Sequence, residues 1–436
     1  MKIKKLIITA TIVLVSALSL STRATLTYAK QQAFKVDAKA AFAFDQKTGK
    51  IFYAKNADKP LGIASITKIL SSYIVLEKIH QKKLNWTDKI PIKEYPYELT
   101  LNTELSNVPL EKGTSYSVKE LFDSGMIASA SSGVIALAEK VAGTEAKFVE
   151  MMKKKLKEWG IKEADVQLVN STGINNSFVP EKYHIPGSKK DQENMMSARS
   201  VAVVAYHLLN DYPEILEVSK KTKEQFGVGT FSEFEMKNLN GMLPGMNWEY
   251  EGIDGLKTGT SELAGQCFVG TCLKKNQRIV TVVLHANGAE ENNGARYTET
   301  ADLMDFVHDN WKYEQITSKG KTLKQVKTLS VKDGKKDNVA LVLGEDVKDW
   351  VCDDMNKDNL QMSWDKSHKK ALTAPVKKDE NVGKVTIQLK DDKLGYLLPS
   401  QQQHHYQMVT NEDVKRQFFL KVWGNHILEW LDGKFK

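Results

Sequence analysis

The sequence predicts an α+β fold in which helices pack on an antiparallel sheet, followed by a smaller all-β domain. Alternating apolar and polar residues at 40–54 and at 265–286 are typical of strands, and they enclose a middle with helical periodicity. Beyond about residue 314 the composition shifts toward Lys, Asp, Val and Thr, and KVTIQLK at 384–390 alternates again. Strands on both sides of a helical middle predict one sheet that the helices cover, and the later strands predict a separate β domain.

Each element has its own local signal. The first strands, AAFAFDQKTGKIFYA, turn at a polar segment that ends in Gly49, which is typical of a β-hairpin. Helical material begins at Ser65, and a polar turn divides GQCFVGTCLKKNQRIVTVVLHA into two later strands. Apolar residues at helical spacing predict further helices at 118–142, at 144–158, at 197–209 behind a serine N-cap, and at about 295–311.

The chain of 436 residues is long enough for two folded domains. We place the first at 37–312 and the all-β domain at 315–408. Residues 1–29 combine a basic start, an apolar run from Leu6 to Leu20 and a tolerable cleavage site at Thr27-Tyr28-Ala29. These features predict a secretory signal peptide, because the apolar run is shorter than the ~20 residues that cross a bilayer. We therefore expect an extracytoplasmic protein, with an uncleaved anchor as the alternative.

The last segment, 410–436, predicts an amphipathic helix. One broad side of this helix carries Phe418, Phe419, Val422, Trp423, Ile427, Trp430 and Leu431, and the other carries Lys421, Asn425, Glu429 and Asp432. An aromatic face near the end of an exported chain favours a helix that lies in the membrane interface. We therefore expect attachment to the outer face of the cell membrane, and docking of the helix on its own domain is the alternative.

The net charge limits the kinds of partner that we expect. The formal net charge of +8 includes four basic residues of the signal peptide, so the mature chain carries +4. This modest excess does not indicate a partner made of nucleic acid.

The three cysteines are Cys267, Cys272 and Cys352, and the first two point to opposite faces of one predicted strand. We expect buried free thiols and no disulfide.

Ser65 and Lys68 are the strongest candidates for a catalytic pair. They stand three apart near the start of a predicted helix, so both side chains lie on one face. A serine hydroxyl is a weak nucleophile until a base takes its proton, and lysine is a base only when it is neutral. Burial among Ile66, Ile69 and Leu70, with a second cation nearby, lowers a lysine pKa.

Neither this motif nor the next is specific by itself. Ser-x-x-Lys recurs at Ser318, Ser363 and Ser367 in polar segments, where a solvated surface is the expected role. Lys-Thr-Gly occurs at 47–49, inside the hairpin turn, and again at 257–259 within GIDGLKTGTSELAG, directly before the later strand pair.

The second Lys-Thr-Gly predicts an edge strand that recognises an anion. Lys257 supplies positive charge, and Gly259 allows a substrate backbone to approach closely. The hydroxyls of Thr258 and Thr260 can bind a carboxylate. A plain strand end with these residue types is the alternative.

The order of these motifs resembles the penicillin-recognising serine acyl-transferases, for which S-x-x-K, S-D-N and K-T-G are signatures. Within that superfamily, ASITKIL at 64–70, ALAEKVAGT at 136–144 and GLKTGTSELAG at 255–265 are similar to the D-alanyl-D-alanine carboxypeptidases, the low-molecular-weight penicillin-binding proteins of bacteria. The resemblance covers residues 37 to about 312, and the β domain with its C-terminal helix matches the family's usual layout. It implies release of D-alanine from peptidoglycan stem peptides that end in D-Ala-D-Ala, with no cofactor and with β-lactams as covalent inhibitors.

Carried onto this sequence, the resemblance implies a role for each matching residue. Ser65 would be the acylated nucleophile and Lys68 its general base, while the backbone N–H groups of Ser65 and Thr260 would stabilise the oxyanion. Lys257 and Thr258 would assist proton transfer and binding, and the Thr260 side chain would hold the terminal carboxylate of the substrate.

The middle motif departs from the family pattern. Counting back from ALAE places Ser-x-Asn on Ser129, Ala130 and Ser131, so a serine stands where asparagine is expected. Ser129 could still relay a proton between Lys68 and the leaving amine. Ser131 lacks the separate donor and acceptor of a carboxamide, so we expect a working substitute with a weaker hold on Lys68 or on the substrate amide.

Two weaker candidates remain. Arg199 could reach the site as a substrate-binding residue, although an arginine in the first turns of a surface helix is more often solvated. His404 and His405 are adjacent, but no Cys or carboxylate stands at ligand spacing, so we expect no metal site there.

Three other functions stay open at this point. A serine β-lactamase has the same first motif but is commonly a single domain, and an endopeptidase that cuts cross-links has the same signatures. A wall-binding or scaffolding protein with a site impaired at Ser131 belongs to a different class. Turnover of a D-alanyl-D-alanine peptide separates this last function from the carboxypeptidase.

Overall fold

The computed structural model describes residues 34–418 except 289–291, 324–326, 366–369 and 403. The chain divides into two compact units. The larger unit contains Ala33–Asp309 and Tyr396–Leu398, and the smaller one contains Asn310–Gly395 and the residues from Pro399 on. The predicted signal peptide, 1–29, and residues 419–436 of the predicted C-terminal helix lie outside the described residues.

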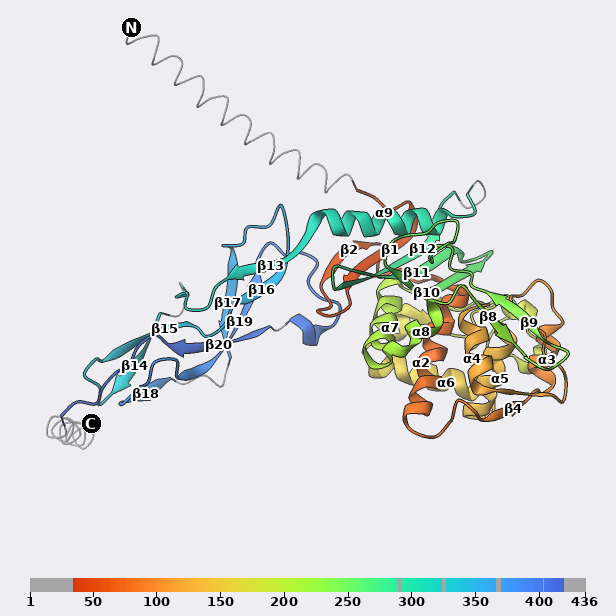
Figure 1. The fold of residues 1–436 in the computed structure, drawn as a ribbon, viewed down its shortest axis with the longest axis horizontal. Helices are drawn as coiled ribbons and strands as arrows, with labels where there is room; N and C mark the ends of the chain where they lie inside the picture. Colours follow the sequence, from red (N-terminus) through yellow and green to blue (C-terminus); the bar gives the residue numbers. More distant parts are fainter. Residues whose placement is uncertain (1–33, 289–291, 324–326, 366–369, 403, 419–436) are drawn as a thin grey trace, which may run out of the picture. The chain divides into compact units, whose positions relative to one another are not determined.

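A five-stranded antiparallel sheet, in the order β10-β11-β12-β1-β2, forms the centre of the larger unit (Figure 1). β1 (Ala38–Asp45) pairs with β2 (Ile51–Lys55) around the turn at Gly49, as the sequence predicts. The strands β10 (Ile253–Ser261), β11 (Gly265–Lys274) and β12 (Gln277–Ala286) form a meander, and β12 pairs with β1. The sheet therefore joins the two ends of this unit, and the predicted α+β arrangement is confirmed.

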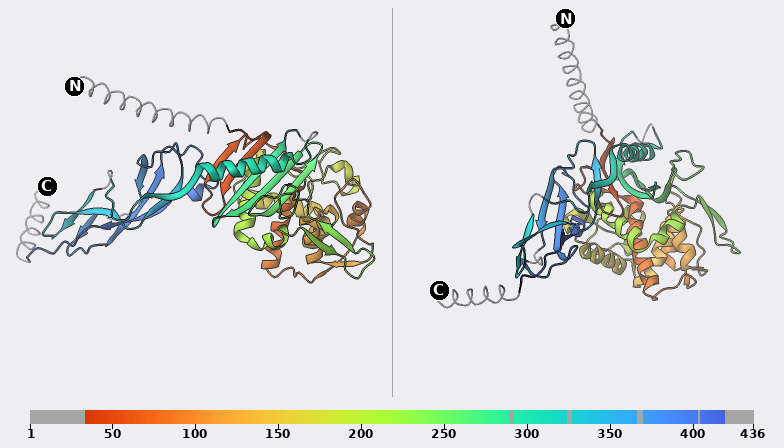
Figure 2. Two further views of the ribbon diagram at one scale, coloured as in Figure 1. Left: turned by 45° about the horizontal axis from the view of Figure 1, so that its top comes forward. Right: turned by 60° about the vertical axis from the view of Figure 1, so that its left-hand side comes forward.

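Helices cover both faces of this sheet, as Figures 1 and 2 show. On one face α9 (Ala295–Asn310) packs through Tyr297 and Met304 against Phe268 of β11. On the other face α7 (Ala198–Asp211) contacts β1 and β12. The same helical layer also contains α2 (Lys68–His80), α3 (Glu94–Thr100), α4 (Val118–Met126), α5 (Ser131–Ala142), α6 (Glu145–Glu158) and α8 (Leu216–Ser219).

The helices predicted between residues 65 and 311 are present, and one of them is divided in two. Thr144 and Ser197 cap α6 and α7, because their side chains accept from backbone N–H groups of the first turn. The segment predicted as helical from 118 to 142 is interrupted after Met126 and resumes at Ser131. Apolar spacing continues across the break, but Ser129 has a φ of 57°, in the left-handed region that a right-handed helix cannot contain.

Short elements complete the larger unit. Three small sheets contain β3 (Leu61–Gly62) with β7 (Met195–Met196) and β6 (Val166–Gln167), β4 (Lys89–Pro91) with β5 (Ser115–Ser117), and β8 (Lys223–Phe226) with β9 (Phe234–Lys237). The 3₁₀ helix η1 (Ala64–Thr67) follows β3 and leads directly into α2. Because η1 also contacts β10, it connects the helical layer to the edge of the main sheet.

The smaller unit is built from strands, which confirms the all-β prediction. Its six-stranded sheet has the order β17 (Leu360–Trp364), β19 (Asn381–Leu389), β20 (His405–Thr410), β15 (Asn338–Leu343), β14 (Thr328–Lys332) and β18 (Ala371–Thr373). β13 (Trp311–Thr317) pairs with β16 (Val347–Cys352). In β19 the alternate residues Val385, Ile387 and Leu389 are buried, so the period of two read from the sequence gives this sheet its core.

Residues 411–418 continue the β structure of the smaller unit. Val414 is buried and forms a bridge with Val376, and Arg416 forms a bridge with Gly334. The amphipathic helix placed at 410–436 therefore does not begin at residue 410. Within the described ranges, no helix combines the length and the apolar character that crossing a membrane requires.

The three cysteines are buried, as the sequence analysis expects. Cys267 and Cys272 both lie in β11 and are completely enclosed by the core. Burial raises the pKa of each of these thiols to about 11, so they stay protonated and unreactive near neutral pH.

Candidate active site

Ser65 and Lys68 meet where η1 passes into α2. Ser65 lies in η1 and is partly exposed, whereas Lys68 is the first residue of α2 and is 0% exposed. The Lys68 Nζ atom lies 2.8 Å from Ser65 Oγ. The fold thus brings the predicted pair within hydrogen-bonding distance.

Two further oxygen atoms surround the amine of Lys68. Ser131 Oγ lies 3.3 Å from Nζ, and the carbonyl oxygen of Thr172 lies 3.1 Å from it. A neutral amine can donate to these two oxygens while its lone pair accepts the proton of Ser65. Burial, and to a lesser degree the neighbouring Lys257, lower the pKa of Lys68 well below its ordinary value of 10.5. The environment therefore favours the neutral form that a general base needs.

The carbonyl of Thr172 is held by a buried polar network that the sequence analysis did not find. Asn170 Oδ1 accepts from the backbone N–H groups of Thr172 at 3.2 Å and Gly173 at 2.6 Å. The carboxylate of Glu145 accepts from the backbone N–H of Ser171 at 2.8 Å and from its hydroxyl at 2.6 Å. Because these partners fix three consecutive residues, the oxygen that faces Lys68 has a defined position.

Gly173 allows this loop to pass close to the segment that carries Ser65. Its φ is +80°, and a Cβ atom at this position would lie 1.8 Å from the carbonyl oxygen of Ala64 and 2.6 Å from Thr67 Oγ1. Both the backbone conformation and the space therefore require glycine.

The Lys-Thr-Gly segment lies in β10, against η1. Lys257 and Thr258 are buried and Thr260 is exposed. A Cβ atom on Gly259 would lie 2.5 Å from the carbonyl oxygen of Ile63, so this glycine permits the close approach of η1. The sequence suggested that Gly259 lets a substrate backbone approach, whereas the structure shows that it makes room for η1. Burial, with a contribution from Arg296, lowers the pKa of Lys257 to about 7.

Arg296 is a residue of this site that the sequence analysis missed. It stands in the first turn of α9 and is 7% exposed. Its Nη2 donates to Thr260 Oγ1 at 2.7 Å, and its Nη1 donates to the carbonyl oxygens of Gly259 at 3.0 Å and Cys267 at 3.1 Å. No local pattern marks this arginine, because only the packing of α9 on β11 brings it to the end of β10.

Positive charge gathers at the end of β10, where Arg296 and, in part, Lys257 lie. Among the described residues, no carboxylate forms an ion pair with Lys68, Lys257 or Arg296, and the recorded partners of these side chains are hydroxyl, carbonyl and amide oxygens. Buried cations without a protein counterion attract an anionic group. The arrangement therefore fits a ligand that carries a carboxylate.

The two serines of the middle motif have different surroundings. Ser131 begins α5, contacts Lys68 through its hydroxyl and donates its backbone N–H to the carbonyl of Ser106 at 3.0 Å. Ser129 lies in the turn between α4 and α5 and is 2% exposed. Within the part of the chain that the structure describes, it is not among the hydrogen-bond partners of Lys68.

Arg199 is not brought to this site. It lies in α7, where its Nε donates to Asp58 Oδ1 at 2.6 Å and its guanidinium stacks 5.2 Å from the centre of the Phe42 ring. Its hydrogen bond and charge lower the pKa of Asp58. These contacts give Arg199 a structural role at a distance from the cavity described next.

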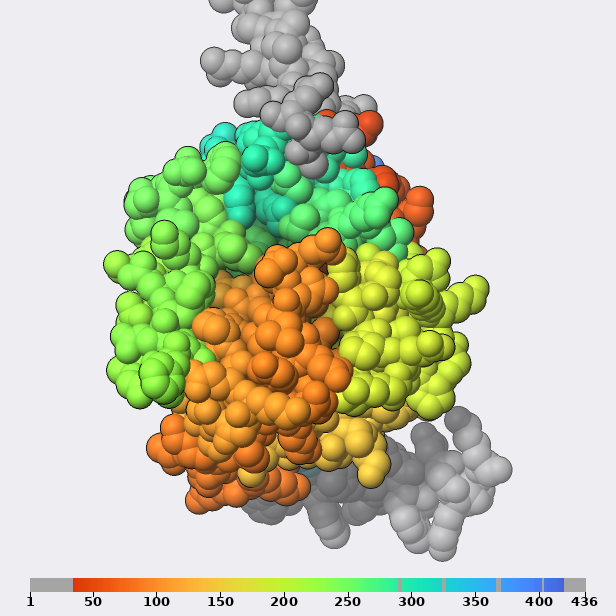
Figure 3. Space-filling view, turned by 90° about the vertical axis from the view of Figure 1, so that its right-hand side faces the viewer, coloured from red at the N-terminus to blue at the C-terminus, as the bar shows by residue number. Residues whose placement is uncertain are grey.

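Ser65 opens into a cavity of about 300 Å³. Ser131, Glu193 and Thr260 also line it, together with residues from three separate segments, 104–106, 173–178 and 261–262. On the face shown in Figure 3, the orange segment near residue 100 lies beside the yellow-green segment near residue 180. The cavity walls therefore come from parts of the chain that are distant in sequence.

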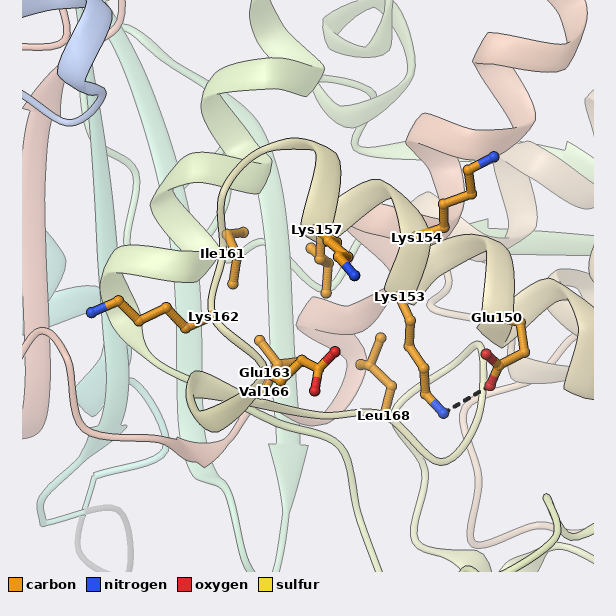
Figure 4. A pocket seen from close by; sticks show the side chains of 10 residues that line it. Glu150, Lys153, Lys154, Lys157, Ile161, Lys162, Glu163, Val166 and Leu168 are labelled. Carbon is orange, nitrogen blue, oxygen red and sulfur yellow. Dashed lines mark hydrogen bonds and ion pairs between the residues drawn. The ribbon is translucent and has the colours of Figure 1, made fainter.

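A second and larger cavity, of about 520 Å³, lies along α6 (Figure 4). Its lining combines lysines and glutamates of α6 and of the loop that follows it with apolar side chains that include Leu156 and Leu168. None of the predicted catalytic or substrate-binding residues lines this cavity, so the site belongs to the smaller one.

A serine beside a buried lysine, next to a K-T-G strand on an antiparallel sheet, defines a serine acyl-transferase of the penicillin-recognising class. The family model described as D-alanyl-D-alanine carboxypeptidase, peptidase S11, matches residues 26–288. The model of the C-terminal domain of penicillin-binding protein 5 matches residues 311–416. The chain therefore belongs to the D-alanyl-D-alanine carboxypeptidase family of serine peptidases, as the motifs indicate.

Individual relatives are similar to this protein over most of its length. D-alanyl-D-alanine carboxypeptidase DacF of Bacillus subtilis is 27% identical over 400 residues, which are 92% of this chain and 91% of that protein. The carboxypeptidase DacC of Escherichia coli is 28% identical over 396 residues, which are 90% and 88% of the two chains. A solved structure of a peptidoglycan synthesis regulatory factor, PBP3, from Streptococcus pneumoniae is 38% identical, with a TM-score of 0.70 and coverage of 87% of this chain and 100% of that one.

Proposed function

We propose that this protein removes the terminal D-alanine from peptidoglycan stem peptides through an acyl-enzyme on Ser65. The observation that carries the proposal is the 2.8 Å contact between Ser65 Oγ and the Nζ atom of a completely buried lysine. Family membership supplies the reaction class, and the positive charge of Arg296 at Thr260 matches a substrate with a free C-terminal carboxylate.

In the first half of the reaction, Lys68 takes the proton of Ser65 while Oγ attacks the carbonyl carbon of the penultimate D-alanine. The backbone N–H groups of Ser65 and Thr260 stabilise the oxyanion. When the C–N bond breaks, the leaving amine receives a proton from Lys68, directly or through Ser129. Free D-alanine departs, and the remaining peptide is an ester of Ser65.

The terminal carboxylate of the substrate would lie at the end of β10. Arg296 already donates to Thr260 Oγ1 there, and Lys257 is close enough for its pKa to respond to the charge of Arg296. These groups, with the hydroxyl of Thr258, hold the carboxylate and so place the preceding peptide bond at Ser65. A substrate without this carboxylate would lose these charge-assisted hydrogen bonds.

In the second half of the reaction, water attacks the ester carbonyl carbon while Lys68 takes a proton from the water. The bond between this carbon and Ser65 Oγ then breaks, Lys68 returns the proton to Oγ, and the shortened peptide leaves with a new C-terminal carboxyl group. A β-lactam would acylate Ser65 by the same initial attack, but its ring-opened product stays attached and blocks the site. Ser131, 3.3 Å from Lys68 Nζ, would hold the amine during both steps in place of the family's asparagine.

The test is D-alanine release from a D-alanyl-D-alanine peptide by residues 30–436, together with covalent labelling by a fluorescent penicillin. We expect the native protein to do both and Ser65→Ala to do neither. Labelling without turnover would favour an impaired, wall-binding protein instead. Faster hydrolysis of a cross-linked muropeptide than of a monomeric one would favour an endopeptidase.

We also propose that the signal peptide at 1–29 exports the chain and that residues 419–436 hold it in the membrane interface. Support comes from the sequence alone, namely the short apolar run at the start and the aromatic face of the helix that the sequence predicts at the end. Because Val414 and Arg416 form bridges within the smaller unit, a deletion should begin after Phe418. Removing 419–436 should release the mature protein from membranes, and a truncated protein that still sediments with them contradicts the anchor.

A further inference from the structure

Three carboxylates line the cavity at Ser65, and they bear on which stem peptide it accepts. They are Glu104, Glu193 and Glu262. Among the described residues, no lysine, arginine or histidine forms an ion pair with any of them. The cavity therefore combines cationic groups beside Thr260 with carboxylates on the turn that follows it and on the 104–106 segment, and these charges would meet different parts of a bound peptide.

The position of Glu104 is fixed by the start of α5. Its segment is tied to that helix because Ser131 donates its backbone N–H to the carbonyl of Ser106 at 3.0 Å, and Ser132 donates to Asn107 Oδ1 at 2.9 Å. Glu104 itself is exposed and lines the cavity. Its carboxylate is therefore available to a ligand on a wall that is anchored next to Lys68.

Glu262 stands on the turn that follows the Lys-Thr-Gly strand, two residues beyond Thr260. The hydroxyl of Ser261 orders this turn, since it accepts from the backbone N–H of Ala264 at 2.9 Å and donates to Glu193 Oε2 at 2.5 Å. Glu262 is exposed and lines the cavity, so its carboxylate is also available to a ligand.

Glu193 places a further negative charge behind these two residues. It is 2% exposed, and its oxygens accept from Ser261 and, at 3.1 Å, from the Asn175 side chain. These neutral donors satisfy its hydrogen bonds without cancelling its charge. Because it lies in a low-dielectric environment, its field extends further into the cavity than that of a solvated carboxylate.

We infer that the cavity selects uncross-linked stem peptides whose third residue carries a free amino group on its side chain, with Glu104 and Glu262 as the residues that recognise the ammonium. This inference rests on the proposed function, which places the last residue beside Arg296 and the penultimate one on Ser65. The third residue then follows at the negatively charged walls. Cross-linking through this amino group converts the ammonium into a neutral amide, so the same carboxylates discriminate against a cross-linked peptide.

The experiment compares two pentapeptides that end in L-Lys-D-Ala-D-Ala and differ only in acetylation of the lysine side-chain amine. D-alanine release is measured for the native protein, for the double variant Glu104→Gln/Glu262→Gln, and for Glu163→Gln as a control. Glu163 is also an exposed glutamate, but it lines the separate cavity of Figure 4.

We expect the native protein to show a kcat/KM about fivefold higher for the free amine, a preference that decreases with added salt, as for partly exposed charge pairs. In the double variant the ratio of the two kcat/KM values should fall to about one, whereas Glu163→Gln should keep the native ratio. Equal rates on both peptides, or a preference that survives in the double variant, would overturn this inference while leaving the carboxypeptidase intact. Absence of D-alanine release from either peptide would overturn the proposed function as well.

Discussion

The substitution Gly173→Ala tests how closely the loop behind the active site controls Ser65. The added Cβ would lie 1.8 Å from the carbonyl oxygen of Ala64, which precedes the nucleophile, at a residue whose φ is +80°. The left-handed conformation costs an alanine about 1–2 kcal/mol, and forcing an extra carbon into a filled space costs about 1–3 kcal/mol more. We therefore expect a loss of about 2–5 kcal/mol in the free energy of unfolding of the larger unit.

Activity should fall further than stability alone explains. Relief of the clash must move either Ala64, and with it Ser65, or Thr172, whose carbonyl oxygen lies 3.1 Å from Lys68 Nζ. A displacement of about 1 Å in a reacting group can lower a rate about 100-fold. We expect acylation of the folded variant by a fluorescent penicillin to be slower by about this factor, measured at a temperature well below the unfolding transition.

The matched control is Gly160→Ala. Gly160 has a similar φ of +76°, but no atom lies within 4 Å of its added Cβ. It should therefore lose only the conformational part, about 1–2 kcal/mol, and acylate at the native rate. Calorimetric unfolding and the acylation rate are measured for both variants. If Gly173→Ala matches Gly160→Ala in both measurements, the reasoning from the close approach is refuted.

Three further predictions concern groups around the same site. The folded pKa of Lys257, about 7, lies below its ordinary value of 10.5, so the unfolded chain binds more protons between these values and the free energy of unfolding rises with pH. Between about pH 7 and about pH 9, the free energy of unfolding measured by urea titration should rise by about 2 kcal/mol less in Lys257→Met than in the native protein. An equal rise in both proteins would contradict this prediction. Ser131→Asn should keep or raise the kcat/KM for D-alanine release, because a carboxamide offers Lys68 the acceptor that the hydroxyl now supplies; a large loss would show that the pocket is adapted to serine. Glu145→Met removes the acceptor of both Ser171 hydrogen bonds, so it should cost about 1–3 kcal/mol of stability and slow acylation, and an unchanged acylation rate would show that Glu145 does not control the position of Lys68.

Local spacing was enough to predict that Ser65 and Lys68 meet and that the K-T-G segment is a strand. Ser65 and Lys68 are three residues apart on one helical segment, so their contact follows from helix geometry alone. In the same way, the alternation at 265–286 is a property of neighbouring residues, and it predicts β11 and β12. The family resemblance added the roles of these residues, because the motifs by themselves recur elsewhere in polar segments.

The break at 127–130 shows where local spacing failed. The apolar pattern runs on from α4 into α5, so hydrophobic periodicity alone predicts one helix. In the folded chain Ser129 adopts a left-handed conformation, and Ser131 is thereby placed at the beginning of α5, where its hydroxyl reaches Lys68. A turn of this kind is fixed by contacts with the 106–107 segment, which periodicity does not report.

The sequence by itself determined the α+β class, the second β unit, the family, and the serine and lysine that meet at the start of α2. Only the tertiary structure decided what surrounds them. Lys68 and the carbonyl of Thr172 are separated by 104 residues, and Arg296 reaches Thr260 from a helix on the other side of the strand meander. The tertiary structure also showed that Arg199 lies away from the site, where it contacts Asp58. The physical reason is that charge, burial and pKa depend on what packs around a side chain, and distant segments of the chain supply those neighbours.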